Sequence, residues 1–196
     1  MSPTNILNVG YDSTNYYLIG IPAPKLLVDI GWAGTLPKLI HALQRYNLQL
    51  KDIPYALATH YHPDHAGLAQ DAKQQGVKLI VMENQTVTVA DFGKYMKPEN
   101  HYTPILLKDN IQLRFDESRK FLAGIGLAGE IIATPGHSED SVTLVLDDGL
   151  AFTGDLHPAE FATEEQQEKT LASWDRIRSL GVHSIYPGHG PVRQIR

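Results

Sequence analysis

The side chains best suited to chemistry in this sequence are four metal-binding groups packed into six consecutive residues. They are His60, His62, Asp64 and His65, and they directly follow an apolar run at residues 55–59. Imidazole nitrogens and carboxylate oxygens are ligands of zinc, and iron or manganese would also accept them. One ion takes three or four protein ligands, and six neighbouring residues cannot all wrap a single ion. We therefore expect two zinc ions, with His60 and His62 serving one and Asp64 and His65 the other.

Three later residues share one local context and are candidates for the missing ligands. Each follows a short apolar run that is ended by Gly or Pro, and they are His137, Asp155 and His189. Such runs are typical of strands that end in turns. We expect four strand ends to converge on one site, because loops held by a rigid sheet are where sites usually lie. The alternative, unrelated core histidines and turn aspartates, explains any one residue but not all seven.

The ordered set of these motifs resembles a known family. H-Y-H-P-D-H, followed by T-P-G-H-S, F-T-G-D and Y-P-G-H-G, is similar to the metallo-β-lactamase superfamily of metal-dependent hydrolases, from the L-V-D-I-G run at residues 27–31 through Pro191. The resemblance implies that the first metal is held by His60, His62 and His137, the second by Asp64, His65 and His189, and that Asp155 bridges both. It also implies that Asp29 hydrogen-bonds to a metal-bound histidine. Alternatively, Asp29 is an ordinary turn residue before Gly31.

Two zinc ions can share one hydroxide that forms near neutral pH, and this hydroxide would be the nucleophile. One metal would polarise the substrate carbonyl, the other would stabilise the leaving atom, and Asp64 could hold the hydroxide by a hydrogen bond. His157 could protonate the leaving group, although a surface position before Pro158 is the alternative. Thr59 and Ser138 adjoin ligands, and we expect their hydroxyls to hydrogen-bond there rather than to act as catalysts.

Several branches of the family that this sequence resembles are disfavoured by particular features. The chain ends soon after residue 191, which we expect to leave no room for the helical C-terminal domain of glyoxalase II. His62 stands where flavodiiron proteins carry Glu. The function we expect is hydrolysis of a small ester, thioester or lactone. The alternatives are a mono-iron sulfur dioxygenase that uses His60, His62 and His137, and a non-catalytic, metal-stabilised binding protein.

The charge and the apolar content of the chain exclude some classes of binding partner. The 196 residues predict a single domain, 1–196, and the net charge is −5 with 17 scattered Lys and Arg, so no basic patch for nucleic acid is expected. There is no cysteine, no basic or apolar leader at the first residues, and no apolar run of the roughly 18 residues that a membrane helix needs. We expect a cytoplasmic protein with a small-molecule acyl substrate and no membrane partner. The sequence leaves the oligomeric state open.

The first half of the chain predicts strands, then alternating helices and strands. We expect strands at residues 6–9, 16–21, 25–30, 55–59 and 77–82. Apolar spacing predicts a helix from Thr35, and a second helix should begin at Pro63 and continue over residues 66–75. Strand, helix and strand in succession favour a parallel pair. Residues 83–103 are predicted as a helix that covers the substrate with Tyr95, Met96, His101 and Tyr102, unless these are ordinary core residues.

The second half predicts further strands and a long final helix. Residues 124–129 match G-x-G-x-x-G, but they follow a helical pattern and lead into a strand, so we expect a helix end rather than a nucleotide loop. Strands are predicted at residues 130–134, 141–146, 150–153 and 184–186. The last helix should start at Thr163 with a capping box to Gln166, pack Leu171, Trp174 and Ile177 on a sheet, and stop at Gly181. The expected fold class is α/β (α+β), an αββα four-layer sandwich of two mixed β-sheets flanked by helices.

Overall fold

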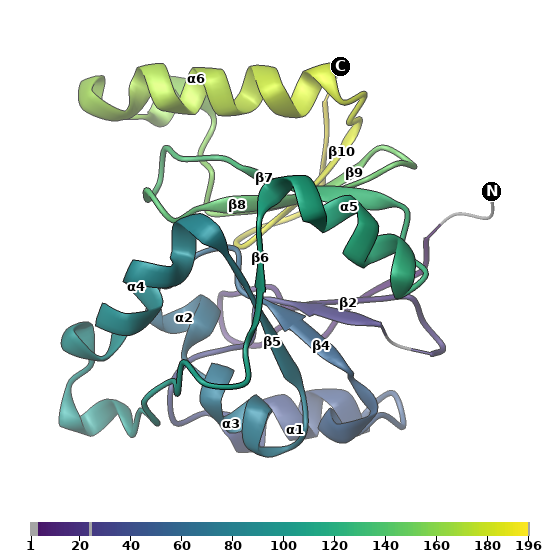
Figure 1. Cartoon of the computed structure of the whole chain (residues 1–196), viewed down its shortest axis with the longest axis vertical. Coiled ribbons are helices and arrows are strands. Elements are labelled where there is room, and N and C mark those ends of the chain that lie inside the picture. Colours follow the sequence, from purple (N-terminus) through teal and green to yellow (C-terminus); the bar gives the residue numbers. More distant parts are fainter. Residues whose placement is uncertain (1–3, 24, 196) are drawn as a thin grey trace.

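A computed structural model of the chain describes residues 4–23 and 25–195, and these residues form a pair of β-sheets that lie face to face between helices (Figure 1). The strands are β1 (Ile6–Asn8), β2 (Tyr17–Ile19), β3 (Leu26–Val28), β4 (Tyr55–Leu57), β5 (Lys78–Met82), β6 (Ile111–Leu113), β7 (Gly129–Ala133), β8 (Val142–Leu146), β9 (Leu150–Gly154), β10 (Ser184–Pro187) and β11 (Arg193–Gln194). The α-helices are α1 (Leu36–Gln44), α2 (Pro63–Ala66), α3 (Ala69–Gln74), α4 (Thr86–Asp91), α5 (Phe115–Gly124) and α6 (Glu164–Ser179). Short 3₁₀ turns occupy Leu50–Asp52, Glu83–Gln85, Phe92–Tyr95, Pro98–Asn100 and Ala159–Phe161.

Both sheets are mixed. The first runs in the order β1-β2-β3-β4-β5-β6, with an antiparallel meander through β3 and parallel pairs from β3 to β6. The second runs β11-β10-β9-β8-β7, and among its described strands only β9 and β10 pair in parallel. The prediction of two mixed sheets between helices is therefore confirmed.

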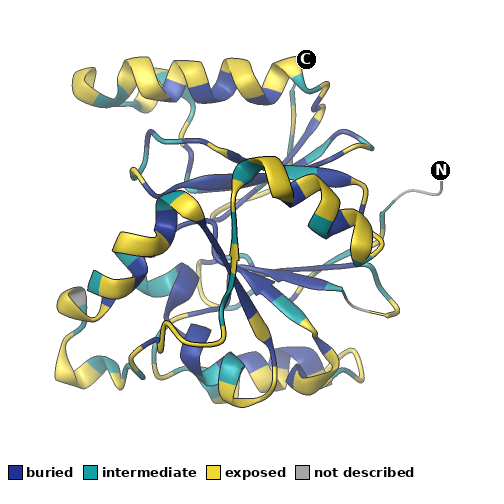
Figure 2. Cartoon of the chain, viewed as in Figure 1, coloured by how far each residue is buried: buried dark blue, intermediate teal, exposed yellow. Residues whose placement is uncertain are grey.

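Three apolar layers separate the four structural layers. One lies between the first sheet and α1 and α3, one lies between the two sheets, and one lies between the second sheet and α6. Strand β5 shows how sequence alternation builds them, because Leu79 and Val81 join the helix side and Ile80 and Met82 join the inter-sheet side. Successive strand residues point to opposite faces, so both faces of a central strand must be apolar. The inner strands β2–β5 and β8–β10 are accordingly buried along most of their length, whereas the edge strands β1, β6 and β11 are not (Figure 2).

The predicted helix from Pro63 to residue 75 is interrupted. It forms as α2 and α3, with the break at Gly67 and Leu68. The Leu68 N–H donates to the Gly31 carbonyl at 3.2 Å, so the chain contacts the segment after β3 at this point. A Cβ at Gly67 would lie 2.1 Å from the Ala33 nitrogen, which explains the glycine. Tertiary contact therefore overrides local helix propensity here.

Two details predicted for α6 are wrong. Thr163 occupies the N-cap position, but its hydroxyl donates to Gln166 Oε1 at 3.2 Å and the capping box does not form. Leu171 is 44% exposed, whereas Trp174 and Ile177 are buried as expected. The buried stripe of the helix is continued by Thr170 and Ser173, and Leu171 lies about 100° around the axis from Thr170.

The remaining predictions are met in part. Residues 83–95 form short helical turns, but residues 101–110 contain no helix, and the short edge strands β6 and β11 were not predicted. The glycines at 124–129 end α5 and lead into β7, as expected. Within residues 4–23 and 25–195, no helix is long and apolar enough to cross a membrane.

Candidate metal centre

The seven candidate ligands come together at one edge of the two sheets. His60 and His62 follow β4, Asp64 and His65 lie in α2, and the other three follow β7, β9 and β10, namely His137, Asp155 and His189. In the parallel pairs β4–β5 and β9–β10 these are the carboxyl ends of the strands, where ligand sites of α/β sheets usually form. The expected convergence of four strand ends is what the structure shows.

Three overlapping groups of side chains have ligand atoms within 4.8 Å of one another. They are His60 with His62 and His137, His60 with His65 and Asp155, and Asp64 with His65 and His189. Each group could hold a metal ion. The first and third groups match the two sets that the sequence predicts.

Asp155 lies between the two sets. Its Oδ2 is 4.0 Å from His60 Nε2 and 3.8 Å from His137 Nε2, on the side of the first set. On the other side its Oδ1 is 3.3 Å from His65 Nε2, and its Oδ2 is 3.4 Å from His189 Nε2. One carboxylate with this placement can contact ions on both sides.

Gly188 shows how tightly the loop of the last ligand packs against the others. A Cβ at this position would lie 2.6 Å from Asp155 Oδ1 and 2.6 Å from His65 Cε1. Any larger residue would push these ligands apart, so the close approach requires glycine.

Asp29 lies behind the cluster and hydrogen-bonds to one of the candidate ligands. Its carboxylate is buried and accepts hydrogen bonds from the Thr59 N–H at 2.7 Å, the Thr59 hydroxyl at 3.0 Å and His65 Nδ1 at 2.8 Å. Thr59 Oγ1 also lies 3.1 Å from His60 Nδ1. Because the Thr59 hydroxyl donates to Asp29, it accepts a hydrogen bond from His60 Nδ1–H, so neutral His60 presents an unprotonated Nε2 to the site. His65 donates from Nδ1 to Asp29, which directs its Nε2 toward the site.

The pKa values of the site reflect burial and mutual contact. Burial, together with the His65 and His62 rings, lowers the pKa of His60 well below its ordinary value. Burial acts in the same direction on His65, but the carboxylates of Asp29, Asp155 and Asp64 outweigh it and raise the pKa of His65 well above its ordinary value. A cation bound at Nε2 would take the place of that proton, since metal ligands must be deprotonated.

The two carboxylates that face the ligands are ionised. Burial alone would raise the pKa of Asp64 and of Asp155, but the interaction of each carboxylate with His65, whose Nε2 lies 3.3 Å from both, outweighs burial and lowers both pKa values. Asp64 Oδ2 lies 3.3 Å from His65 Nε2 and 3.1 Å from His189 Nε2. These oxygens are therefore available at neutral pH as anionic ligands.

Buried polar atoms give an independent test of whether the site suits a metal. His60 Nε2, His65 Nε2 and Asp155 Oδ1 are buried and have no hydrogen-bond partner among the described residues. Orphaned buried polar atoms are rare and costly. Three of them pointing into one cluster fit bound cations, and imidazole and carboxylate donors suit zinc, iron or manganese.

The other predicted residues lie around this cluster. His157 is exposed and its ring centroid lies 5.5 Å from that of His137, so it stands at the rim of the cluster. The Ser138 hydroxyl lies 2.7 Å from Ser141 Oγ rather than against a ligand. In the segment predicted to cover the substrate, Met96 and Tyr102 pack against the core and His101 is exposed. The Tyr95 side chain lies outside the described portion of the chain.

Two cavities flank the cluster. One of about 510 Å³ lies beside His62 and is lined by Tyr61, His62, Pro63, Thr88, Ser138, Glu139 and Asp140. The other, of about 170 Å³, lies on the side of Asp155 and His189 and is also lined by His157 and Arg193. Thr88 belongs to α4, so a portion of the segment 83–103 lines the cavity beside His62.

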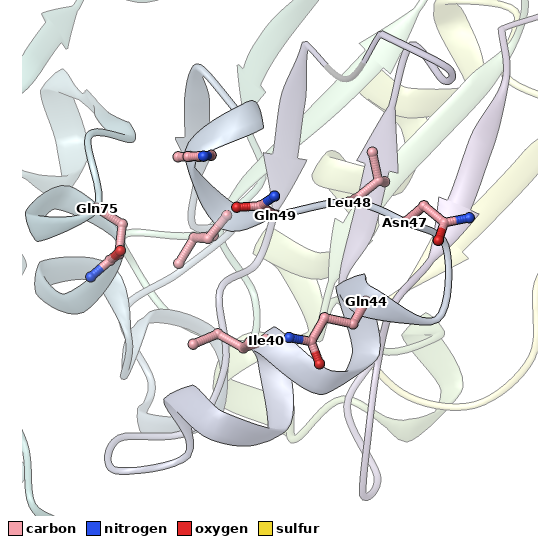
Figure 3. A pocket seen from close by; sticks show the side chains of 8 residues that line it. Ile40, Gln44, Asn47, Leu48, Gln49 and Gln75 are labelled. Atoms are coloured by element: carbon pink, nitrogen blue, oxygen red, sulfur yellow. The ribbon is translucent and has the colours of Figure 1, made fainter.

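A larger groove of about 610 Å³ is lined by none of the candidate ligands. It lies at the amino-terminal edge of β4 and β5, opposite the metal ligands, and amide side chains such as Gln44, Gln49 and Gln75 surround it (Figure 3). Among the described residues that line it there is no histidine and no carboxylate. Size alone therefore does not identify the functional cavity.

Two residues that support the site escaped sequence reasoning. Thr14 is buried and its hydroxyl donates to Asp64 Oδ2 at 3.1 Å. Asp140 is buried and accepts the Tyr61 N–H at 2.7 Å, which ties the histidine motif to the loop after His137. Thr14 is far from the ligand motifs in sequence and had no pattern to mark it, whereas Asp140 could have been found from its place three residues after His137.

Comparison with known sequences places these features in a family. The profile of the "Metallo-beta-lactamase superfamily" matches residues 9–189. Similar proteins include a "Beta-lactamase-like protein 2 homolog" of Caenorhabditis elegans, 30% identical over 182 residues that cover 91% of this chain and 56% of the relative. The homologue in Drosophila melanogaster is 29% identical over 183 residues, covering 91% of this chain and 59% of that protein. This chain thus spans less than two thirds of the length of these two relatives.

Other relatives match over more of their length. A "probable metallo-hydrolase" of Methanocaldococcus jannaschii is 28% identical over 202 residues, which cover 93% of this chain and 90% of that protein. Among solved structures, a metallo-beta-lactamase family protein from Thermus thermophilus has a TM-score of 0.74 at 21% identity, covering 99% of this chain and 75% of that one. A class B3 di-zinc metallo-beta-lactamase from an Alaskan soil metagenome has a TM-score of 0.70 at 18% identity, covering 96% and 77%. The two structures show the same fold.

Proposed function

The chain belongs to the metallo-beta-lactamase superfamily of metallo-hydrolases, and from this membership and its ligand cluster we propose that it cleaves a small ester, thioester or lactone at a dinuclear zinc centre. The single observation that carries the proposal is the position of Asp155, within 4.0 Å of ligand nitrogens on both sides. One mononuclear site would leave the Asp64, His65 and His189 set without a role. The second set therefore favours a dinuclear hydrolase over a mono-iron dioxygenase.

Charge balance supports two divalent ions. Among the described residues, Asp29, Asp64 and Asp155 are the carboxylates that contact the ligand cluster, and together they carry three negative charges. Two divalent cations carry four positive charges, so the loaded centre would keep a net charge of about +1. Such a centre attracts an anionic nucleophile and stabilises negative charge that develops on a substrate oxygen.

The mechanism assigns separate tasks to the residues around the centre. When bound, the two metal ions would supply hydroxide at neutral pH and polarise the substrate carbonyl. Asp29 and Thr59 keep His60 and His65 in the tautomer that leaves Nε2 free. Asp64 Oδ2 faces the cluster beside His65 and His189, where it can accept a hydrogen bond from the nucleophile and hold it in place. His157 stands at the rim, where an imidazole could deliver a proton to the leaving group.

The cavity beside His62 supports a small substrate. Its volume of about 510 Å³ falls within the range of small-molecule sites, and a serine, a threonine and the rings of Tyr61 and His62 supply most of its walls. Of the described residues, Arg193 is the one Lys or Arg that lines the smaller cavity, and the larger one is lined by the carboxyl groups of Glu139 and Asp140. Binding of a phosphate backbone needs several Lys or Arg contacts, so these cavities do not favour nucleic acid as a partner. We propose that the substrate is a small acyl compound in the cytoplasm and that the protein has no membrane partner.

Initial rates on a matched panel test the reaction class. Zinc-loaded protein should hydrolyse at least one thioester, ester or lactone faster than it hydrolyses a bis-phosphodiester, and Asp64→Ala should abolish that activity. Faster phosphodiester turnover that is lost in Asp64→Ala would overturn the substrate class. A protein that binds both ions but turns over nothing in the panel would instead support a binding role.

Two variants of helix α4 test the location of the acyl group. Thr88 lines the cavity beside His62, whereas Thr86 is exposed on the same helix. Thr88→Trp should raise KM for a long-chain ester at least tenfold and leave a short-chain ester nearly unchanged. Thr86→Trp serves as the matched control and should change neither. Equal behaviour of the two variants would place the acyl group elsewhere.

A further inference from the structure

The turn between β1 and β2 lies against the loop that carries His189. The Asn15 N–H donates to the Gly188 carbonyl at 2.8 Å, and Thr14 forms an isolated antiparallel bridge with His189. The two segments belong to different sheets and are more than 170 residues apart in sequence. The turn therefore joins the first sheet to the second at the metal centre.

Asn15 holds the His189 loop on both sides of the ligand. Its Nδ2 donates to the Pro187 carbonyl at 2.9 Å and to the Gly190 carbonyl at 2.8 Å. Asn8 Nδ2 donates to Asn15 Oδ1 at 2.8 Å, which fixes the amide with its NH₂ group toward the loop. With both donor hydrogens and the acceptor engaged, the side chain has one defined orientation.

The neighbouring residues of the turn reach the ligands themselves. His189 Nδ1 lies 2.7 Å from the Ser13 carbonyl, and because a carbonyl only accepts, Nδ1 carries the proton and Nε2 is free for a metal. Thr14 donates to Asp64 Oδ2, which orients the carboxylate that lies 3.1 Å from His189 Nε2. Two of the three residues in the Asp64, His65 and His189 set are thus fixed by this turn.

The other set receives no such support. Among the described residues, no hydrogen bond joins residues 11–15 to His60, His62 or His137. His60 is held instead by Thr59, and His137 Nε2 lies 3.0 Å from His62 Nδ1. Asp29 and Thr59 thus support His65 and His60, one from each set, whereas the hydrogen bonds from residues 13–15 go to Asp64 and His189 of the second set.

We propose that Ser13, Thr14 and Asn15 are positioning residues for the second metal ion, so that this turn sets the affinity of the Asp64, His65 and His189 set independently of the first. The inference rests on the dinuclear centre proposed above. His189 is 40% exposed at the edge of the molecule, and its loop would lose its main anchors without the turn. Residues that orient metal ligands typically change metal affinity about 10- to 100-fold when they are replaced.

Zinc binding at buffered free concentrations, measured as ions per chain, tests the inference without any enzymatic assay. Thr14→Val keeps the shape but removes the donor to Asp64, and Thr14→Ser restores it. Asn15→Asp keeps the acceptor for Asn8 but cannot donate to the Pro187 and Gly190 carbonyls. Thr103→Val is the matched control, because it removes the hydroxyl that donates to Asp71 at 3.3 Å, away from the ligands.

The expected result is a split between the two binding steps. Thr14→Val and Asn15→Asp should bind the first ion with wild-type affinity and the second at least tenfold more weakly, while Thr14→Ser and Thr103→Val bind both ions normally. If the variants weaken both steps equally, or change neither, the inference about the turn is wrong. Binding of two ions by the wild type in the same experiment would still support the dinuclear centre. A wild type that binds a single ion at every zinc concentration would overturn both.

Discussion

Replacing Asp29 by Asn should weaken metal binding, because it reverses one hydrogen bond in the chain that orients the ligands. Asp29 has a positive φ of 60°, and Asn is one of the few residues that tolerate such a backbone, so the local fold should survive. The Thr59 N–H, 2.7 Å away, requires an oxygen at the Oδ1 position. The new NH₂ group must then face His65 Nδ1, which now donates to Asp29 Oδ2 at 2.8 Å.

The Asn NH₂ group and His65 Nδ1–H would then both be donors and would face each other, so the protonation of His65 must change. Nδ1 must lose its proton so that it can accept from the Asn amide, and the proton that remains on the ring is then fixed on Nε2, the nitrogen that faces Asp64 and Asp155. To bind Nε2, zinc must displace that proton, and the proton cannot return to Nδ1 without breaking the hydrogen bond from the Asn amide. Zinc binding should therefore weaken by about 10- to 100-fold, or about 1.4–2.7 kcal/mol. Loss of the charge-assisted bond should also destabilise the metal-free protein by about 1.5–3 kcal/mol.

Competition with a chromophoric chelator measures the affinity, and thermal unfolding of the metal-free protein measures the stability. Asp71→Asn is a suitable control, because Asp71 also accepts a threonine hydroxyl but lies away from the ligands. It should leave zinc affinity unchanged. Zinc affinity of Asp29→Asn within threefold of wild type would show that the tautomer of His65 is not set by Asp29, and the reasoning would fail.

Three further outcomes are expected. Asp155→Ala should lower the content of both ions and abolish hydrolysis. His157→Ala should keep two ions per chain and change only the rate of hydrolysis. A His157 variant that loses metal would contradict the position of His157 at the rim. A chelator should lower Tm by roughly 10 °C, because binding at a thousandfold excess over Kd contributes about 4 kcal/mol; an unchanged melt after verified metal removal would argue against a structural metal. The raised pKa of His65 means that its ion pair stabilises the metal-free protein fully below about pH 6.5 and is lost as pH rises through the raised value. The Tm of chelated protein should therefore fall more steeply toward alkaline pH in wild type than in Asp29→Asn, and parallel profiles would refute this.

The sequence by itself selects the ligand side chains and the fold class. The spacing of His60, His62, Asp64 and His65 is local, and each remaining ligand follows an apolar run with its own breaker. Strand alternation and helical spacing are also local, so they predict the two sheets and most helices without knowledge of the neighbours. Asp29 could be named in advance only through the family resemblance, because its place after a strand is equally typical of an ordinary turn residue.

Tertiary structure alone decided how these elements fit together. Helix α2 is separated from α3 because Gly67 packs closely against the segment after β3. Strand β11 forms because Arg193 pairs with Ile185 of β10 in an antiparallel ladder. The contacts of Asn15 with the His189 loop span about 175 residues, and nothing near Asn15 in the sequence indicates them. Local propensity is a property of a short window, whereas pairing between distant segments depends on strand register and sheet packing, which only the folded chain defines.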